Sequence, residues 1–182
     1  MMSAGRIAVR YAKPLLELAR EKSVLDEVKE DMESFSSLCK ENRDFALMLK
    51  SPIIPHLKKA EILNKAFKGK YTELTLEALG LIARKNREAL LEAIANEFVA
   101  LYNDMKGISK VTVTTTFTLD SDLKTSFENL AKEVTGNIPL VFEIVDPEIL
   151  GGYIMQFGDK QDKQIDDSVR GQLKELKLKF SK

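Results

Sequence analysis

The sequence predicts an α+β fold, in which an N-terminal all-α six-helix bundle over residues 1–106 precedes a small mixed α/β domain over residues 107–182. Three observations lead to this prediction. The chain has 182 residues, 44% of them hydrophobic, which is enough for two small cores. From Arg6 to Met105 the apolar residues recur with the period of a helix and β-branched residues do not cluster. After Gly107 the chain changes to "KVTVTTTFTL", whose threonines and valines favour a strand.

The N-terminal half divides into helices at five short breaks. These breaks are the segments "KSV", "ENR", "SPIIP", "FKGK" and "KNR", which interrupt the helical pattern. Pro52 and Pro55 enclose the third break, because proline lacks an amide hydrogen and disfavours helix in the residue before it. The helices predicted between the breaks cover residues 6–21, 24–41, 43–50, 56–68, 72–85 and 87–105.

The C-terminal half alternates between strand and helix patterns in the order β-α-β-β-α. After the strand in "KVTVTTTFTL" we expect a helix over 121–135, strands over 139–145 and 152–157, and a final helix over 168–179. This order is too mixed for a helical bundle and too short for a doubly wound dinucleotide-binding fold.

Charge and cysteine content limit the function classes. Lys and Arg total 28, as do Asp and Glu, so the chain lacks the positive field of a general nucleic-acid binder. Cys39 and His56 are the single cysteine and the single histidine, which excludes an intramolecular disulfide and a Cys/His zinc cluster. We therefore expect no metal site and a reducing compartment. No apolar run approaches the roughly 20 residues of a membrane span, and charges interrupt the N-terminal segment.

Gly151 and Gly152 raise the question of a phosphate-binding loop. Such a loop needs spaced glycines followed by Lys and Ser or Thr at the start of a helix. Here the glycines lead into the strand "YIMQF", so we interpret them as a turn or bulge. Asp166, Asp167 or Ser168 can cap the helix that is predicted to follow. The sequence also lacks a nucleophile elbow, a kinase signature and a P-loop, so we expect no enzyme.

The first predicted helix has more apolar surface than one seam of a bundle requires. Its charged residues fall within a polar arc of roughly 80°, whereas a surface helix needs an apolar stripe only slightly wider than about 100°. The helix over 72–85 repeats this feature, and the small residues Ala78 and Gly80 would let another backbone come close. Two interpretations stay open: a central helix wrapped by its own bundle, or a helix that also lines a groove for a partner helix. Pro14 is expected to kink the first helix.

Four segments, taken together, resemble the delta subunit of bacterial F-type ATP synthases, the counterpart of the mitochondrial oligomycin-sensitivity-conferring subunit. They are "RIAVRYAKPLLELAREK", "SPIIPHLKKAEILNKAF", "LGLIARKNREALLEAIANEFVALYNDMKGISKVTVTT" and "VDPEILGGYIMQFGDK…IDDSVRGQLKEL", and they cover nearly the whole chain. The tail is the most specific, with "GG", "GDK" and then Asp166, Ser168, Arg170 and Gly171 in the family's order. The sequence departs from the family pattern at Pro14 and in the longer segment between Gly158 and Asp166.

The resemblance implies a non-catalytic stator subunit of an F-type ATP synthase, which resists rotor torque during proton-driven ATP synthesis. Its bundle would bind the N-terminal helix of the alpha subunit between the first and fifth helices, and its C-terminal domain would bind the b-type peripheral stalk. It implies no cofactor, no nucleic acid and no small-molecule substrate, and a peripheral location on the cytoplasmic side of the inner membrane, with membrane contact only through the complex. Carried over by position, the groove residues are Ile7, Tyr11, Pro14, Leu15, Leu18, Leu74, Ala78 and Leu81. The residues of the C-terminal structural motif are Gly151, Gly152, Asp166, Ser168 and Arg170.

Two other function classes remain open from the sequence. One is a small enzyme or ligand-binding protein whose site is assembled from residues far apart in the chain. The other is an adaptor that binds a helical peptide outside any ATPase. A stator subunit should co-purify with the membrane-bound ATPase and show no turnover or nucleotide affinity on its own, which separates it from the first class. Presence of its gene among those for the other synthase subunits would separate it from the second.

Overall fold

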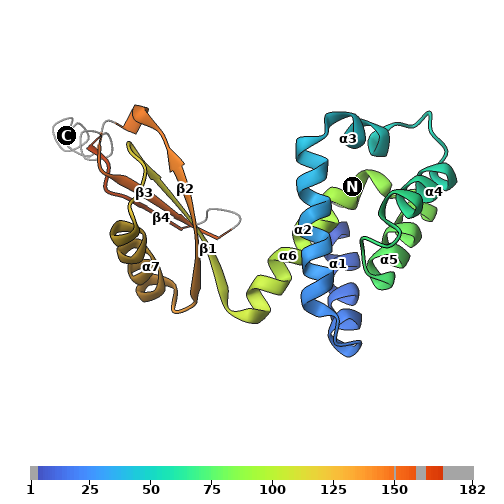
Figure 1. Ribbon diagram of the computed structural model, residues 1–182, viewed down its shortest axis with the longest axis horizontal. Helices are drawn as coiled ribbons and strands as arrows, with labels where there is room; N and C mark the ends of the chain where they lie inside the picture. The colour runs from blue at the N-terminus through green and yellow to red at the C-terminus, as the bar shows by residue number, and fades with distance from the viewer. Residues whose placement is uncertain (1–3, 150, 159–162, 170–182) are drawn as a thin grey trace. The chain divides into compact units, whose positions relative to one another are not determined.

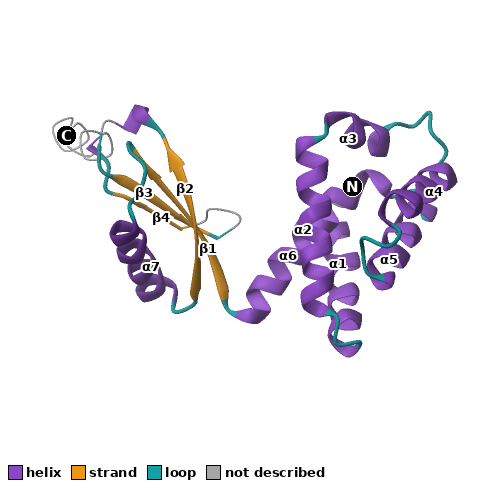
Figure 2. Cartoon of the chain, in the orientation of Figure 1, coloured by secondary structure: helices purple, strands orange, loops and turns teal. Residues whose placement is uncertain are grey.

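The computed structural model describes residues 4–149, 151–158 and 163–169. The chain divides into two compact units, Met1–Tyr102 and Asn103–Lys182. The first unit is helical, and the second contains a sheet and a helix (Figures 1 and 2). The predicted α+β fold class is confirmed.

The first unit contains the six predicted helices. Their bounds differ from the prediction by a few residues, and a 3-10 turn, η1, forms the start of the sixth. The last helix extends beyond Tyr102 into the second unit. The elements are α1 Ala4–Glu21, α2 Leu25–Glu41, α3 Arg43–Lys50, α4 His56–Phe67, α5 Glu73–Arg84, η1 Glu88–Leu90 and α6 Leu91–Lys106.

One face of α1, which consists mainly of alanines, is buried in the core of the first unit. Ala8, Ala12, Leu15 and Ala19 are buried and recur at the spacing of one helix face, so neighbouring helices can approach α1 closely. Aromatic rings fill another part of this core. The rings in mutual contact are those of Phe35, Phe45, Phe67 and Tyr71.

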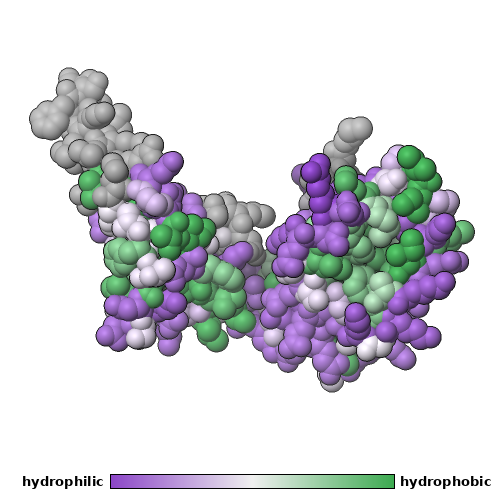
Figure 3. All heavy atoms as spheres, turned by 45° about the horizontal axis from the view of Figure 1, so that its top comes forward, coloured by the Kyte–Doolittle hydropathy of each residue, from purple (hydrophilic) through white to green (hydrophobic). Residues whose placement is uncertain are grey.

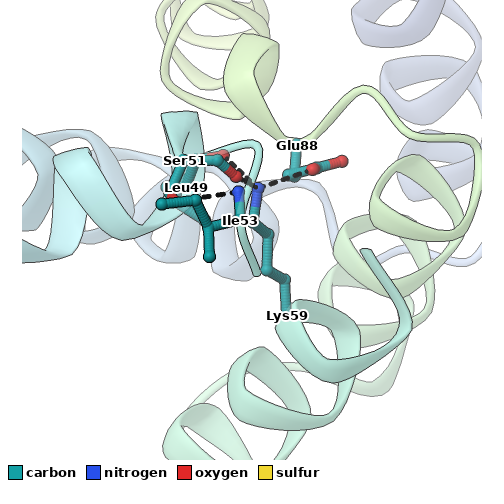
Figure 4. Close-up of polar contacts among 5 residues, drawn as sticks. All are labelled: Leu49, Ser51, Ile53, Lys59 and Glu88. Atoms are coloured by element: carbon teal, nitrogen blue, oxygen red, sulfur yellow. Dashed lines mark hydrogen bonds and ion pairs between the residues drawn. The ribbon is translucent and has the colours of Figure 1, made fainter. Parts of the chain in front are cut away.

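A buried lysine holds the turn between α3 and α4. Lys59 Nζ donates hydrogen bonds to the carbonyl oxygens of Leu49, at 2.8 Å, and Ser51, at 2.6 Å (Figure 4). It also lies 2.7 Å from Glu88 Oε1, at the start of η1 (Figure 4). The last carbonyl groups of a helix have no partner within the helix, so Lys59 supplies the donor that the end of α3 lacks.

The second unit is a four-stranded sheet in the order β2-β1-β3-β4. β1 and β2 are parallel and α7 connects them, whereas β3 and β4 are antiparallel neighbours. The 3-10 turn η2 lies between β2 and β3. The elements are β1 Ile108–Thr115, α7 Ser121–Thr135, β2 Ile138–Val145, η2 Pro147–Ile149, β3 Tyr153–Phe157 and β4 Lys163–Asp166.

One face of this sheet forms the second core. Val111, Val113, Met155 and Phe157 point to the same face because alternate strand residues do so, and they pack with Ala131 of α7. The sequence prediction missed β4, because four residues reading "KQID" show no alternation of apolar and polar side chains. The predicted helix over 168–179 lies outside the described residues, apart from its first two positions.

The glycine pair forms a turn against the chain that follows β4. Gly152 has φ +79°, and a Cβ atom there would lie 2.2 Å from the carbonyl oxygen of Asp167. Gly151 accepts a hydrogen bond from the amide of Val169 at 3.1 Å. Asp166 Oδ1 accepts from the amide of the buried Ser168, which fixes this contact. The pair therefore permits a close approach of two backbone segments.

Candidate functional site

The position of α5 is fixed at its N-terminus by a carboxylate from α2. Thr72 caps α5, since its hydroxyl oxygen accepts a hydrogen bond from the amide of Thr75 at 3.2 Å. Asp31, which is buried in α2, accepts from the amide of Thr72 at 2.8 Å and from its hydroxyl at 2.9 Å. The charge run of α2 is typical of a solvated face, so the sequence pattern does not predict this role of Asp31.

The other end of α5 is tied to α1. Asn86 follows α5 with φ +57°, a left-handed backbone conformation that commonly ends α-helices. Its amide donates a hydrogen bond to the carbonyl oxygen of Ala83. Arg87 follows, and its guanidinium carbon lies 5.6 Å from the centre of the Tyr11 ring of α1. This distance is within the range of a cation–π contact.

Between the two helices lies an open, mainly apolar groove with a volume of about 360 Å³. Each helix contributes five lining residues. From α1 they are Arg10, Tyr11, Pro14, Leu15 and Leu18, and from α5 they are Leu74, Glu77, Ala78, Leu81 and Ile82.

The structure brings seven of the eight predicted groove residues together in this lining. Ile7 is half-buried and lies one turn before Tyr11, outside it. α1 continues through Pro14, which is exposed on the groove side. Gly80 faces away, toward a second and more polar hollow between α4 and α5.

Sequence reasoning missed three lining residues. Arg10 and Glu77 are charged, and charge alone places a residue on the polar face of a helix, although each lies one position from a predicted groove residue. Ile82 is a buried core residue that also reaches the groove floor. Because charged side chains at the edges of an apolar stripe belong to both faces, the helical pattern alone could not assign them.

The groove exposes apolar side chains that a closed bundle would bury. Leu18 is 45% exposed and Leu81 is 48% exposed, on opposite walls. Leu15 and Leu74 are buried and form the floor. An open trough of this composition is where amphipathic helices bind in other proteins, with their apolar faces inward. On the face drawn in Figure 3, hydrophobic residues also lie at the surface of both units.

Among the described side chains, the Cys39 thiol and the possible metal ligands are the groups that could take part in catalysis. Burial, with a contribution from the nearby Glu92 carboxylate, raises the pKa of the Cys39 thiol to about 11. This thiol is protonated at neutral pH and is therefore a poor nucleophile. No group of three His, Cys, Asp or Glu side chains that could hold a metal ion occurs in residues 4–149, 151–158 and 163–169. Among the helices described, none is long and apolar enough to cross a lipid bilayer.

Fold and groove together define a class of protein: a two-unit α+β protein with an open, mainly apolar groove between two helices of its helical unit. Comparison with known proteins identifies the family. The family model "ATP synthase delta (OSCP) subunit" matches residues 7–180. The chain belongs to this family, and it is a non-catalytic stator component of the peripheral stalk of an F-type ATP synthase.

Relatives match over nearly their whole length. The ATP synthase subunit delta of Cytophaga hutchinsonii is 37% identical over 180 residues, which cover 99% of this chain and 97% of the relative. That of Amoebophilus asiaticus is 35% identical over 177 residues, with 97% and 95% covered. Among solved structures, a chain of the Toxoplasma gondii mitochondrial ATP synthase hexamer matches with a TM-score of 0.77 at 20% identity, covering 100% of this chain and 99% of that one. At this identity the likeness concerns the fold.

Proposed function

We propose that the groove between α1 and α5 binds the N-terminal helix of the ATP synthase alpha subunit, and that residues 107–182 bind the b-type stalk. The helical bundle over residues 1–106 then holds the catalytic head, and the second domain holds the stalk. In this arrangement the chain resists the torque that the rotor applies to the head. Its place is the cytoplasmic side of the inner membrane, where it contacts the membrane only through the complex and uses no cofactor, nucleic acid or small-molecule substrate.

One observation carries the proposal for the groove: apolar side chains are exposed on both of its walls. Removing apolar surface from water contributes roughly 25 cal/mol per Å², so the exposed parts of Leu18 and Leu81 are a source of binding free energy. The buried face of α1 already contacts the core through its small residues. The exposed side chains of Leu18 and Leu81 are therefore available to a partner without loss of the bundle's own packing.

Calorimetric titration with a synthetic peptide of the alpha subunit's N-terminal helix tests this binding. Leu81→Asp should weaken it about thirtyfold or more, because the new carboxylate is hydrated in the free protein and buried without a partner in the complex. Leu47→Asp is the matched control, since Leu47 is 54% exposed in α3 and lies outside the groove. Equal binding by the parent and Leu81→Asp would contradict the proposal.

Tyr11→Asp should also weaken binding, but Tyr11 packs partly against the core, so its thermal melt must be compared with that of the parent. A variant that melts far below the parent would identify Tyr11 as a core residue. For the stalk, deletion of residues from Gly107 onward should abolish binding of the b-type subunit and leave the peptide affinity unchanged. Loss of both activities would contradict the division between the two domains.

A further inference from the structure

The two charged residues of the groove lie on opposite walls. Arg10 belongs to α1 and Glu77 to α5, and the other eight lining residues are uncharged. Neither side chain forms a hydrogen bond or an ion pair with any other residue in the part of the chain that the structure describes. Both are exposed at the rim of the groove, and Glu77 also borders the polar hollow between α4 and α5.

The net charge of each helix, with its groove residue included, has the same sign as that residue. α1 carries four basic residues, Arg6, Arg10, Lys13 and Arg20, and two acidic residues, Glu17 and Glu21. α5 carries two acidic residues, Glu73 and Glu77, and one basic residue, Arg84. The guanidinium of Arg87 on the Tyr11 ring adds further positive charge beside α1. The α1 wall of the groove is thus positive through Arg10 and the α5 wall is negative through Glu77, along an apolar floor.

From this polarity we infer that the charges on Arg10 and Glu77 select the direction in which a partner helix lies in the groove. This inference rests on the proposed function. A helix with its apolar face on the floor presents one flank to α1 and the other flank to α5. Turning the helix end for end keeps the apolar face on the floor but exchanges the two flanks. An acidic flank against Arg10 and a basic flank against Glu77 therefore stabilise one direction and destabilise the other, as charged flanks do in coiled coils.

The inference specifies the chemistry of the partner. The helix that binds here carries an acidic residue on one side of its apolar stripe and a basic residue on the other. Apolar burial supplies affinity in either direction, whereas the charges supply the difference between them. Exposed ion pairs are weak, and salt screens them, so the effect should be strongest at low ionic strength.

The experiment uses the full chain and the alpha subunit's N-terminal helix as a synthetic peptide. Arg10→Glu and Glu77→Lys should each reduce affinity about tenfold at low salt, because each turns an attraction into a repulsion. This loss should shrink at high salt. The matched controls are Arg43→Glu in α3 and Glu27→Lys in α2, which make the same charge changes at exposed positions outside the groove lining and should bind like the parent.

A charge-swapped peptide gives the decisive measurement. In it the acidic and basic flank residues are exchanged, and the apolar stripe is unchanged. The parent should hold this peptide in the reverse direction, and the double variant Arg10→Glu/Glu77→Lys should hold it in the original direction, with similar affinities. A spin label on the peptide's N-terminus reports the direction, because it broadens the amide signal of whichever α1 groove residue it lies beside, Tyr11 or Leu18. The same direction for both peptides on the parent would overturn the inference and leave the groove proposal intact. A parent that binds neither peptide would overturn the proposed function and this inference with it.

Discussion

Lys59 of α4 and Glu88 of η1 form an ion pair inside the helical unit, with 2.7 Å between Nζ and Oε1. Both side chains are buried, with 2% and 7% of their surface exposed. The same ammonium group donates to the carbonyl oxygens of Leu49 and Ser51, so one lysine joins α3, α4 and η1. The other carboxylate oxygen, Oε2, is buried and accepts no hydrogen bond from the described residues.

Replacement of Lys59 by methionine should destabilise the helical unit strongly. It would leave the Glu88 carboxylate buried without a counter-charge and two carbonyl groups without donors, and breaking a buried ion pair in this way costs about 3–5 kcal/mol. Urea unfolding of Lys59→Met measures the loss. Lys58→Met, one residue away and exposed, is the control and should change the free energy of unfolding by much less. Equal stability of the two variants would show that the ion pair contributes nothing.

The same ion pair predicts that the stability of the protein depends on pH in the acid range. Burial by itself raises the pKa of the Glu88 carboxyl, but hydrogen bonds from Lys59 and from the backbone, with the attraction of Lys59, outweigh it, and the net pKa is lowered. A carboxyl with a lower pKa in the folded state stabilises the protein above its unfolded pKa, and this contribution is lost as the pH falls through the folded pKa.

Stability of the parent should therefore fall more steeply than that of Glu88→Gln between about pH 5 and pH 3. The measurement is the midpoint of urea unfolding at several pH values for both proteins. Glu27→Gln, which changes an exposed carboxyl of α2, should follow the parent. Parallel curves for the parent and Glu88→Gln would contradict the prediction.

The hydrogen bond between Tyr102 and Asp26 predicts that the stability of the protein also depends on pH in the alkaline range. The Tyr102 hydroxyl donates a hydrogen bond to Asp26 Oδ1 at 2.6 Å. This bond, together with burial and the negative charge, raises the pKa of Tyr102 to about 12. A raised pKa stabilises the folded state fully below the unfolded value near 10, and the contribution is lost as the pH rises through about 12.

Tyr102→Phe should therefore lose less stability than the parent between these two values. Asp26→Ala should lower the pH at which this phenol ionises, as followed by tyrosinate absorbance relative to Tyr102→Phe. An unchanged ionisation midpoint in Asp26→Ala would show that the hydrogen bond does not control this tyrosine.

Asp31 should control the stability of the α5 wall. Asp31→Ala leaves the half-buried amide of Thr72 without its acceptor, which costs about 1–3 kcal/mol, whereas the Thr72 hydroxyl can still donate to Thr75 Oγ1. Asp31→Asn keeps one acceptor oxygen and should lose less. Thermal melts of the two variants rank them, and an asparagine variant that is less stable than the alanine variant would contradict this role.

Gly152→Ala should destabilise the second unit far more than Gly158→Ala. Both glycines have φ +79°, where an L-residue costs roughly 1–2 kcal/mol. At Gly158 nothing lies within 4 Å of the added Cβ atom, whereas at Gly152 it would lie 2.2 Å from the carbonyl oxygen of Asp167. Hydrogen exchange of the sheet amides in the two variants measures the difference. Equal protection would show that the chain after β4 moves aside without cost.

Several features could be predicted from the sequence because they depend on local rules. The helix period, the prolines of "SPIIP" and the change to threonine and valine after Gly107 predicted six helices and then a mixed domain, which the structure contains. The wide apolar surfaces of the first and fifth helices predicted more than one buried side. Residues three or four positions apart on a helix share a face, so the spacing of Tyr11, Pro14, Leu15 and Leu18 is enough to group them on one side of the first helix.

Only the tertiary structure decided which side of each helix faces the core and which charges line the groove. The pairing of Lys59 with Glu88, and of Asp31 with Thr72, joins residues 29 and 41 positions apart, and no local pattern encodes such contacts. The same holds for β4, whose four residues form a strand only because the edge of β3 offers hydrogen-bonding groups. Local chemistry fixed the elements of this chain, and long-range packing fixed Arg10 and Glu77 on the facing walls of one groove.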